Sequence, residues 1–312
     1  MDTKRKFIID GYREFSLLGN SEGGMGKVYF LEPVDKTYTK MSPMSRIFAP
    51  LDGKIAVKFP KRLADSDAFE RECRLWLTVR HRHVVPLLKL SEISGQMAAV
   101  MPLYHQNAES LIYESRCNMP ETGSFWYRQF VGICEALNYA WEKSNLLHLD
   151  LKPQNLLNYS EGPNPYLSVA DWGMARFQNY CFFRSNTKKG SERGIESLEA
   201  YGGTLPYMSP ERILGTIRND SYMHQVTDDI FSLGIIMMEV ATKSNPCIDR
   251  SETTSGTIEN ILTGGYYHIV SDVLKKYPGA WCRLAANCCH PDKRRRPKNY
   301  KIIIKELKKY VV

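Results

Sequence analysis

The residues with the clearest chemical signature form a short segment near the middle of the chain, Leu147–Leu157. Within six residues this segment holds an aspartate, a lysine and an asparagine, at Asp150, Lys152 and Asn155, with leucines on both sides. Because leucines are usually buried, the alternation turns the polar side chains the other way. The aspartate can accept a proton, the lysine can neutralise a phosphate, and the asparagine carbonyl can bind Mg²⁺. The segment therefore indicates a site that handles a phosphate and a hard cation.

A further carboxylate follows the strand-like stretch Tyr166–Ala170. Asp171 comes directly after it, and Gly173 lies two residues further on. A carboxylate at the end of a strand suits a hard cation that is carried by phosphates. We therefore expect Asp171 to be a metal ligand.

Two features earlier in the chain could bind phosphates. Leu18–Tyr29 holds several glycines between two strand-like runs, and glycines let backbone N–H groups approach phosphate oxygens closely. Lys58 lies inside the β-type run Ile55–Phe59, where its ammonium must be satisfied. Taken alone, the glycines fit an ordinary turn and the lysine fits an edge strand that reaches solvent. The periodicity of the predicted helix Asp67–Arg80 places Glu72 on its apolar face, so we expect Glu72 to pair with Lys58.

The elements that must position these residues divide the chain into two parts near residue 104. The first part is strand-rich, with one helix and a long polar loop predicted over Pro33–Lys54. The second part is helical. One of its clearest helices begins after the N-cap Ser124 and runs to about Lys143. Another covers the apolar stretch Asp229–Thr242. We therefore expect an α+β protein of two lobes with a ligand cleft between them.

The composition is that of an ordinary globular protein. The 312 residues are 43% hydrophobic and 24% charged, with a net charge of +8, which excludes a disordered chain, a collagen or a disulfide-stapled mini-protein. No apolar run has the about 20 residues of a membrane span, and the N-terminus lacks the apolar stretch of a signal peptide. The eight cysteines form no C-x-x-C pair, so we expect reduced thiols and a cytoplasmic protein. A zinc site at Cys282, Cys288, Cys289 and His290 is the alternative.

The order of these motifs resembles that of the eukaryotic-type (Hanks-type) serine/threonine protein kinases over Tyr12–Lys309. Downstream, Gly203–Glu211 resembles the end of a kinase activation segment, and Asp229–Gly234 the start of the buried helix that anchors the C-lobe. Arg296 matches the arginine that pairs with Glu211 in the family.

The resemblance implies the two-lobed protein kinase fold for most of the chain. The small β-rich N-lobe would span about 12–103 and the mainly helical C-lobe about 104–309, with the nucleotide cleft between them. The first eleven residues and residues 310–312 would be terminal segments outside the domain.

The resemblance also implies Mg²⁺-dependent transfer of the γ-phosphate of ATP to protein hydroxyls. Lys58 would hold the α- and β-phosphates and pair with Glu72. Asp150 would accept the proton of the hydroxyl, and Lys152 would steady the γ-phosphate. Thr204 and Lys152 follow the serine/threonine pattern. The glycines that would cover the phosphates are Gly19, Gly23, Gly24 and Gly26. The adenine and hinge contacts would be Leu18, Val28, Ala56, Met101, Leu103 and Leu157. The metal ligands would be Asn155 and Asp171.

Four departures from the family pattern stand out. The glycine loop carries two extra residues, and Trp172 replaces a phenylalanine. Leu149 stands where the family usually has the arginine that receives the activation-loop phosphate, so we expect activity without loop phosphorylation. Two segments are long: the loop before Lys58, and Asp171–Glu211, whose basic part is expected either to be disordered or to bind an acidic substrate.

No departure removes a catalytic group, so an active kinase with protein substrates is the first hypothesis. A pseudokinase that serves as a binding or scaffold module of the same fold is the alternative, although such chains usually lose the lysine or one of the two aspartates. A small-molecule kinase would share the catalytic loop but lack the peptide-groove segment Gly203–Glu211. The charge run Lys293–Arg296 could indicate nucleic acid, but a solvated helix end with one structural arginine fits it better.

Overall fold

The structure is a computed structural model that describes residues 6–9, 13–23, 26–34, 53–60, 66–93, 95–104, 106–114, 120, 124–159, 166–172, 175–177, 203–218, 222–248 and 253–311. Gly24, most of the Pro33–Lys54 loop and the basic part of Asp171–Glu211 lie outside these ranges. The chain divides into two compact units. Unit 1 comprises Met1–Gln106 and Leu157–Gly173, and unit 2 comprises Asn107–Leu156 and Met174–Val312.

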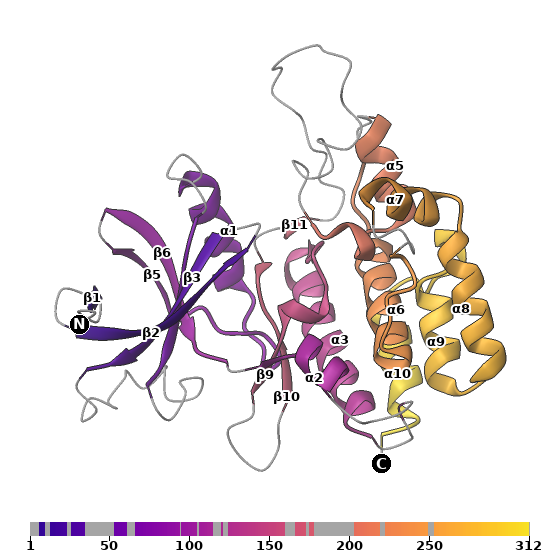
Figure 1. Ribbon diagram of the computed structural model, residues 1–312, viewed down its shortest axis with the longest axis horizontal. Helices are drawn as coiled ribbons and strands as arrows, with labels where there is room; N and C mark the ends of the chain where they lie inside the picture. The colour runs from indigo at the N-terminus through magenta and orange to yellow at the C-terminus, as the bar shows by residue number, and fades with distance from the viewer. Residues whose placement is uncertain are drawn as a thin grey trace. The chain divides into compact units, whose positions relative to one another are not determined.

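Unit 1 is built on a six-stranded antiparallel sheet (Figure 1). Its strands are rich in the β-branched and aromatic residues that fit a pleated surface. One face of the sheet carries a hydrophobic core that includes Phe15, Leu31, Ile55 and Val57. In spatial order the strands are β1 (Lys6–Ile9), β2 (Arg13–Gly23), β3 (Gly26–Pro33), β4 (Ile55–Phe59), β6 (Gln96–Pro102) and β5 (Lys89–Ile93).

The glycine-rich segment of unit 1 is mostly strand rather than the longer loop that its composition predicted. Pairing of β2 with β3 continues as far as Gly23 and Gly26, so only two residues connect the strands. The register shifts between Leu17 and Gly19. Such a bulge re-aims the side chain within it, and Leu18 at this point is 47% exposed.

Helix α1 (Ser66–Thr78) of unit 1 buries Phe69, Cys73 and Trp76, as their spacing predicts. The indole N–H of Trp76 donates to the carbonyl of Val85, at a distance of 2.7 Å. The β-type run 84–90 predicts a strand, but strand structure there is limited to an isolated bridge from Val84 to Val169 and to Lys89 and Leu90, which belong to β5. Pro86 explains the difference, because proline has no N–H to donate to a ladder.

Asp171 in unit 1 follows a strand of a small three-stranded sheet. Its spatial order is β10, β9 and β7. The strand predicted over Tyr166–Ala170 is confirmed as β10. The bounds are β7 (Gln106–Asn107), β9 (Leu156–Tyr159) and β10 (Tyr166–Val169).

Unit 2 is helical and is organised around α6, in which every residue from Val226 to Val240 is buried. The apolar helix predicted over Asp229–Thr242 is therefore confirmed, with an earlier start. Helix α9 packs against α6, and α10 against α3. The helices are α2 (Ala108–Glu114), α3 (Phe125–Ser144), α5 (Pro210–Arg218), α6 (Val226–Thr242), α7 (Thr254–Leu262), α8 (Gly265–Lys276), α9 (Ala280–Cys288) and α10 (Tyr300–Lys308).

Short elements complete unit 2. Strand β8 (Leu146–Leu147) pairs with β11 (Arg176–Phe177). Ser124 occupies the N-cap of α3 as predicted, but its hydroxyl makes no cap hydrogen bond. The 3₁₀ turns are η3 (Pro153–Asn155), η5 (Leu205–Tyr207) and η6 (Lys293–Arg295).

The six cysteines within the described residues are buried free thiols. Burial raises the pKa of Cys282 to about 11 and that of Cys289 to about 12. The part of the chain that the structure describes contains no group of three or more side chains suited to hold a metal through histidine, cysteine and carboxylate ligands. The zinc alternative at Cys282–His290 therefore receives no support.

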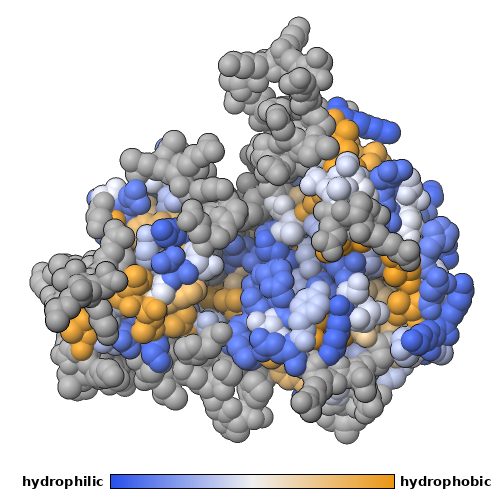
Figure 2. Space-filling model, in the orientation of Figure 1, coloured by the Kyte–Doolittle hydropathy of each residue, from blue (hydrophilic) through white to orange (hydrophobic). Residues whose placement is uncertain are grey.

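The described helices are short or polar compared with a membrane span, and none of them is long and apolar enough to cross a bilayer. On the face drawn in Figure 2, hydrophilic residues predominate over the described helices of unit 2, with smaller hydrophobic patches between them. The large apolar side chains lie mainly in the core.

Candidate active site

Lys58 occupies a central position in the sheet of unit 1. Its strand, β4, lies between β3 and β6, so the edge-strand interpretation of this lysine is wrong. The residue is only 8% exposed, and its Nζ donates to Oδ1 of Asp171 at 2.5 Å. A buried ammonium requires such an anionic partner, because an unpaired charge would be costly away from water.

Asp171 follows β10 in a left-handed backbone conformation with φ of +60°. Aspartate tolerates this region better than most residues, and such outliers gather at functional sites. The next residue, Trp172, is fully buried, as expected for a side chain that fills an apolar pocket. Val169 holds β10 in place, because its N–H donates to the carbonyl of His83 and its carbonyl accepts from Val85.

Glu72 lies half-buried on α1, one residue before Cys73. Burial raises the pKa of the Cys73 thiol to about 12, Lys58 acts to lower it, and Glu72 and Asp171 act to raise it. All three charges therefore lie near the same point of unit 1. The contact that the structure records for Lys58 is with Asp171, and the pairing of Lys58 with Glu72 stays a prediction.

The register of the sheet places the residues expected to contact adenine and phosphate on one face. Val28 pairs with Lys58 across β3 and β4, and Ala56 pairs with Met101 across β4 and β6. Cross-strand partners share a face, as do residues two apart on one strand. These four side chains therefore project from the face opposite the hydrophobic core. Leu103 and Leu157, also in unit 1, are half-buried.

Three candidate catalytic residues of unit 2 form a compact hydrogen-bonded group: Thr204, and Asp150 and Lys152 of the candidate catalytic loop Leu147–Leu157. Asp150 is 4% exposed. Its Oδ1 accepts from Oγ1 of Thr204 at 2.9 Å, and its Oδ2 lies 3.1 Å from Nζ of Lys152. The same lysine donates to Oγ1 of Thr204 at 2.7 Å. The structure thus brings together three side chains, one of which lies 54 residues away in sequence.

Asn155 ends the 3₁₀ turn η3 and joins this group through its amide nitrogen. Nδ2 donates to the carbonyl of Asp150 at 2.8 Å and to its Oδ2 at 3.1 Å. The amide oxygen takes part in neither bond, and oxygen is the ligand that Mg²⁺ prefers. The carboxylate of Asp171 offers the same type of donor, so both residues fit the expected metal chemistry.

Asp229 supports the catalytic loop from the first turn of α6. Its two carboxylate oxygens accept from the backbone N–H groups of His148 at 2.8 Å and Leu149 at 2.7 Å. Tyr300 donates a third hydrogen bond. Burial raises the pKa of Asp229 despite these bonds. The sequence identifies Asp229 only as part of a helix start; a carboxylate next to the apolar run that begins at Ile230 is the signal of its supporting role.

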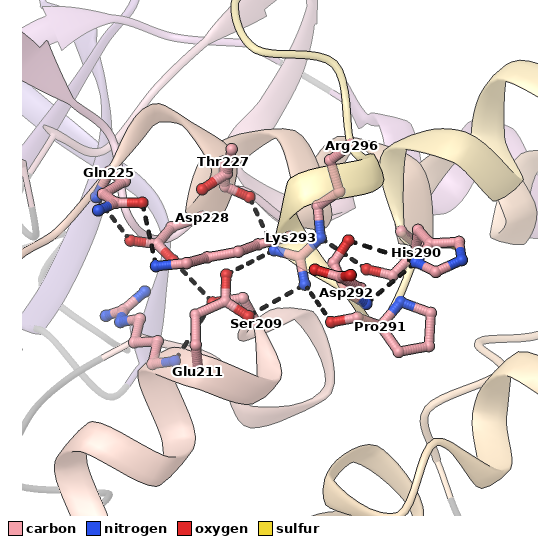
Figure 3. A network of polar contacts seen from close by, with 12 residues as sticks. Ser209, Glu211, Gln225, Thr227, Asp228, His290, Pro291, Asp292, Lys293 and Arg296 are labelled. Atoms are coloured by element: carbon pink, nitrogen blue, oxygen red, sulfur yellow. Dashed lines mark hydrogen bonds and ion pairs between the residues drawn. The ribbon is translucent and has the colours of Figure 1, made fainter.

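Arg296 anchors the end of the Gly203–Glu211 segment, as Figure 3 shows. It is 1% exposed. Its Nη1 and Nη2 donate to the two carboxylate oxygens of Glu211 at 2.6 and 3.0 Å. The predicted pair is therefore confirmed. In the same charge run, Lys293 donates to Gln225. Arg294 pairs with Asp292, and its side chain is 85% exposed, which agrees with a solvated helix end that contains one structural arginine.

Comparison with known proteins agrees with this geometry. Residues 49–309 match the family model described as the protein kinase domain. The chain therefore belongs to the protein kinase family. The matched range begins after the glycine-rich hairpin, so the glycine assignments depend on the motif resemblance.

Several curated relatives are similar to this chain at low identity. The serine/threonine-protein kinase PknD of Protochlamydia amoebophila (strain UWE25) is 26% identical over 255 residues, covering 76% of this chain and 23% of the relative. The mitogen-activated protein kinase sma-5 of Caenorhabditis elegans is 28% identical over 198 residues, covering 62% and 35%. The dual specificity mitogen-activated protein kinase kinase dSOR1 of Drosophila melanogaster is 26% identical over 246 residues, covering 78% and 51%. The chain thus spans about a quarter to a half of the length of these relatives.

Proposed function

We propose that this chain is an ATP- and Mg²⁺-dependent kinase that phosphorylates serine and threonine hydroxyls of proteins. The hydrogen-bonded group of Asp150, Lys152 and Thr204 carries the proposal. It combines a buried proton acceptor, a cation for phosphate oxygens and a hydroxyl that orients both. Phosphoryl transfer needs little more than such positioning and charge neutralisation.

The residues of unit 1 would bind the nucleotide. Lys58 would neutralise its phosphates, and the hairpin that contains Gly19, Gly23, Gly24 and Gly26 would cover them with backbone N–H groups. The apolar residues expected to contact adenine are Leu18, Val28, Ala56, Met101, Leu103 and Leu157. Bound Mg²⁺, held by oxygens of Asn155 and Asp171, would neutralise the charge of the phosphates.

The residues of unit 2 would act on the acceptor hydroxyl. Asp150 would orient it and take its proton as the oxygen attacks the γ-phosphorus, while the bond from that phosphorus to the β,γ-bridging oxygen breaks and ADP leaves. Lys152 would hold the γ-phosphate oxygens during transfer. Thr204 would keep both side chains in register, since it accepts a hydrogen bond from the lysine and donates one to the aspartate.

The two alternatives to this proposal are a pseudokinase and a kinase that phosphorylates tyrosine. The presence of Lys58, Asp150, Asn155 and Asp171 argues against a pseudokinase, because such scaffolds usually lose one of these groups. Some relatives are described as dual specificity kinases, so tyrosine is the competing acceptor. We also propose a cytoplasmic location, which the buried free thiols favour.

The test is transfer of labelled γ-phosphate from Mg·ATP to the chain itself and to a generic basic protein. Asp150→Asn serves as the control, and acid hydrolysis identifies the phosphorylated amino acid. We expect phosphoserine and phosphothreonine with the wild type and no label with the control. Phosphotyrosine would assign dual or tyrosine specificity. Nucleotide binding that depends on Mg²⁺ but yields no label on any protein would favour the scaffold.

A further inference from the structure

The residue before the catalytic aspartate has an unusual backbone conformation. Leu149 has φ of +64° and its side chain is buried, with 3% exposure. A branched residue rarely adopts positive φ, because its Cβ crowds the backbone. The surrounding contacts must therefore hold this conformation, and they determine where the next residue, Asp150, points.

Charged side chains form hydrogen bonds with both backbone polar groups of Leu149, the N–H and the carbonyl. The carboxylate of Asp229 accepts from its N–H at 2.7 Å. On the other side, Nη1 of Arg212, in α5, donates to its carbonyl oxygen. Arg212 is 5% exposed, and a guanidinium keeps its charge and its fixed set of donors in such a setting. The conformation of Leu149 thus has one ionic contact at its amide and another at its carbonyl.

The same guanidinium lies against the backbone just before Thr204. Gly203 has φ of +94°, and a Cβ on this residue would come within 2.9 Å of Nη2 of Arg212 and 3.2 Å of the carbonyl oxygen of Leu149. Only glycine allows so close an approach. Arg212 therefore contacts the residues that directly precede Asp150 and Thr204, which are joined to each other by a hydrogen bond of 2.9 Å.

We propose that Arg212 is a positioning residue for phosphoryl transfer. It fixes the backbone immediately before Asp150 and immediately before Thr204, and so sets the hydrogen bond between them. Both residues of the contact, Leu149 and Arg212, belong to unit 2 and lie 63 residues apart in the chain. The proposal rests on the proposed function in one respect, namely the role of Asp150 as the proton acceptor.

The test compares Arg212→Met, Arg212→Lys and wild type in the full chain. Methionine has a similar length but removes all the donors, whereas lysine keeps the charge and a single donor. Arg218→Met is the matched control, because Arg218 is exposed in the same helix. The readouts are kcat and KM for ATP and for a protein substrate, the melting temperature, and amide hydrogen exchange of the segments that contain Leu149 and Thr204.

We expect Arg212→Met to lower kcat roughly tenfold to a hundredfold, the cost of a small misplacement of catalytic groups. The KM for ATP should change little, because the residues proposed to contact adenine and the α- and β-phosphates belong to unit 1. Arg212→Lys should restore part of kcat. Exchange should become faster in the Leu149 and Thr204 segments of Arg212→Met, and Arg218→Met should match the wild type in every readout.

Two results would overturn the proposal. One is wild-type kcat and exchange in Arg212→Met. The other is faster exchange spread evenly over unit 2 with a lower melting temperature in both Arg212 variants, which would assign a general structural role. If the wild type transfers no phosphate, the proposed function fails. The exchange pattern still decides whether Arg212 holds the two segments: local loss supports the positioning role, and unchanged exchange contradicts it.

Discussion

The Nζ of Lys58 and Oδ1 of Asp171 lie 2.5 Å apart, although 113 residues separate them in the chain. The lysine comes from the middle of the main sheet of unit 1 and the aspartate from the end of β10. The side chains of both residues are mostly buried, with 11% and 25% exposure. Each charge therefore helps to compensate the other in a poorly hydrated place, and removal of one takes this ion pair from the other.

The first prediction concerns this pair. Lys58→Met should lower phosphate transfer by about a hundredfold or more, because the cation that we propose to neutralise the phosphates is lost, together with its ion pair to Asp171. Steady-state transfer from Mg·ATP measures the effect. Arg74→Met is the control, since Arg74 is exposed on α1 and pairs only with Glu70 among the contacts recorded for it. Equal losses in both variants would show that the effect does not come from the pair.

The second prediction concerns the hydroxyl of Thr204, which links the charged side chains of Asp150 and Lys152. Thr204→Val keeps the shape of the side chain but removes both hydrogen bonds to Asp150 and Lys152. We expect kcat to fall roughly tenfold to a hundredfold, because the two groups lose their shared alignment. Thr204→Ser keeps the hydroxyl and should retain most of the activity. Similar kcat values for valine and serine would contradict the role given to the hydroxyl.

The third prediction follows from Leu149. Its apolar side chain is buried and cannot receive a phosphate, and its N–H and carbonyl are both bonded within the chain. We therefore expect kinase activity to survive complete dephosphorylation. Transfer is measured before and after phosphatase treatment, with mass spectrometry to verify that phosphate was removed. Activity that disappears with the phosphate and returns after rephosphorylation would refute this expectation.

The fourth prediction concerns the stability of unit 2. Arg296 makes a bidentate pair with Glu211 and donates to three backbone carbonyls. Arg296→Met should lower the free energy of unfolding by about 3–5 kcal/mol, because Glu211 is left without its partner. Urea denaturation provides the measurement. Arg294→Met is the matched control, since the Arg294 side chain is 85% exposed, and we expect no measurable change for it.

The sequence predicts the parts of the fold that have strong periodicity. Helix α1 is such a case, because Phe69, Cys73 and Trp76 repeat at helical spacing, and α6 is another, because it is apolar almost throughout. Helices α2, α5, α7 and α8 were not predicted. They are short or expose much of their surface, so tertiary packing stabilises them more than any local pattern does. The strand pairing of residues 20–23 was missed because glycine and asparagine rarely favour strands.

The candidate site shows a similar division. Asp150, Lys152 and Asn155 lie close together in sequence, so their residue types alone indicated phosphate chemistry. Thr204 was identified as a site residue only through the family resemblance, because no local sequence pattern connects it with Asp150, which lies 54 residues away. Arg212 carries no sequence signal at all, because an arginine on an amphipathic helix usually lies at the surface. Its burial depends on the loop conformation of Leu149 and Gly203, which only the fold determines.

The fifth prediction concerns Glu239, a buried carboxylate of α6. Burial raises its pKa above the ordinary value of 4.5, although hydrogen bonds from Tyr207 and Tyr113 act to lower it. The folded protein therefore binds this proton more tightly than the unfolded chain does. The stabilisation by the proton is complete below about pH 4.5 and is lost as the pH rises through the raised pKa.

Glu239→Gln isolates this contribution, since glutamine is similar in shape and does not titrate. The stability of the variant relative to wild type should increase as the pH rises from about 4 to 8. Urea midpoints of both proteins, measured side by side over this range, cancel the titration of all other groups. Asp228, on the same helix, has a lowered pKa because hydrogen bonds to its carboxylate outweigh its burial, so Asp228→Asn should show the opposite trend at acid pH. A difference between Glu239→Gln and wild type that is constant with pH would mean that Glu239 keeps its ordinary pKa in the folded protein.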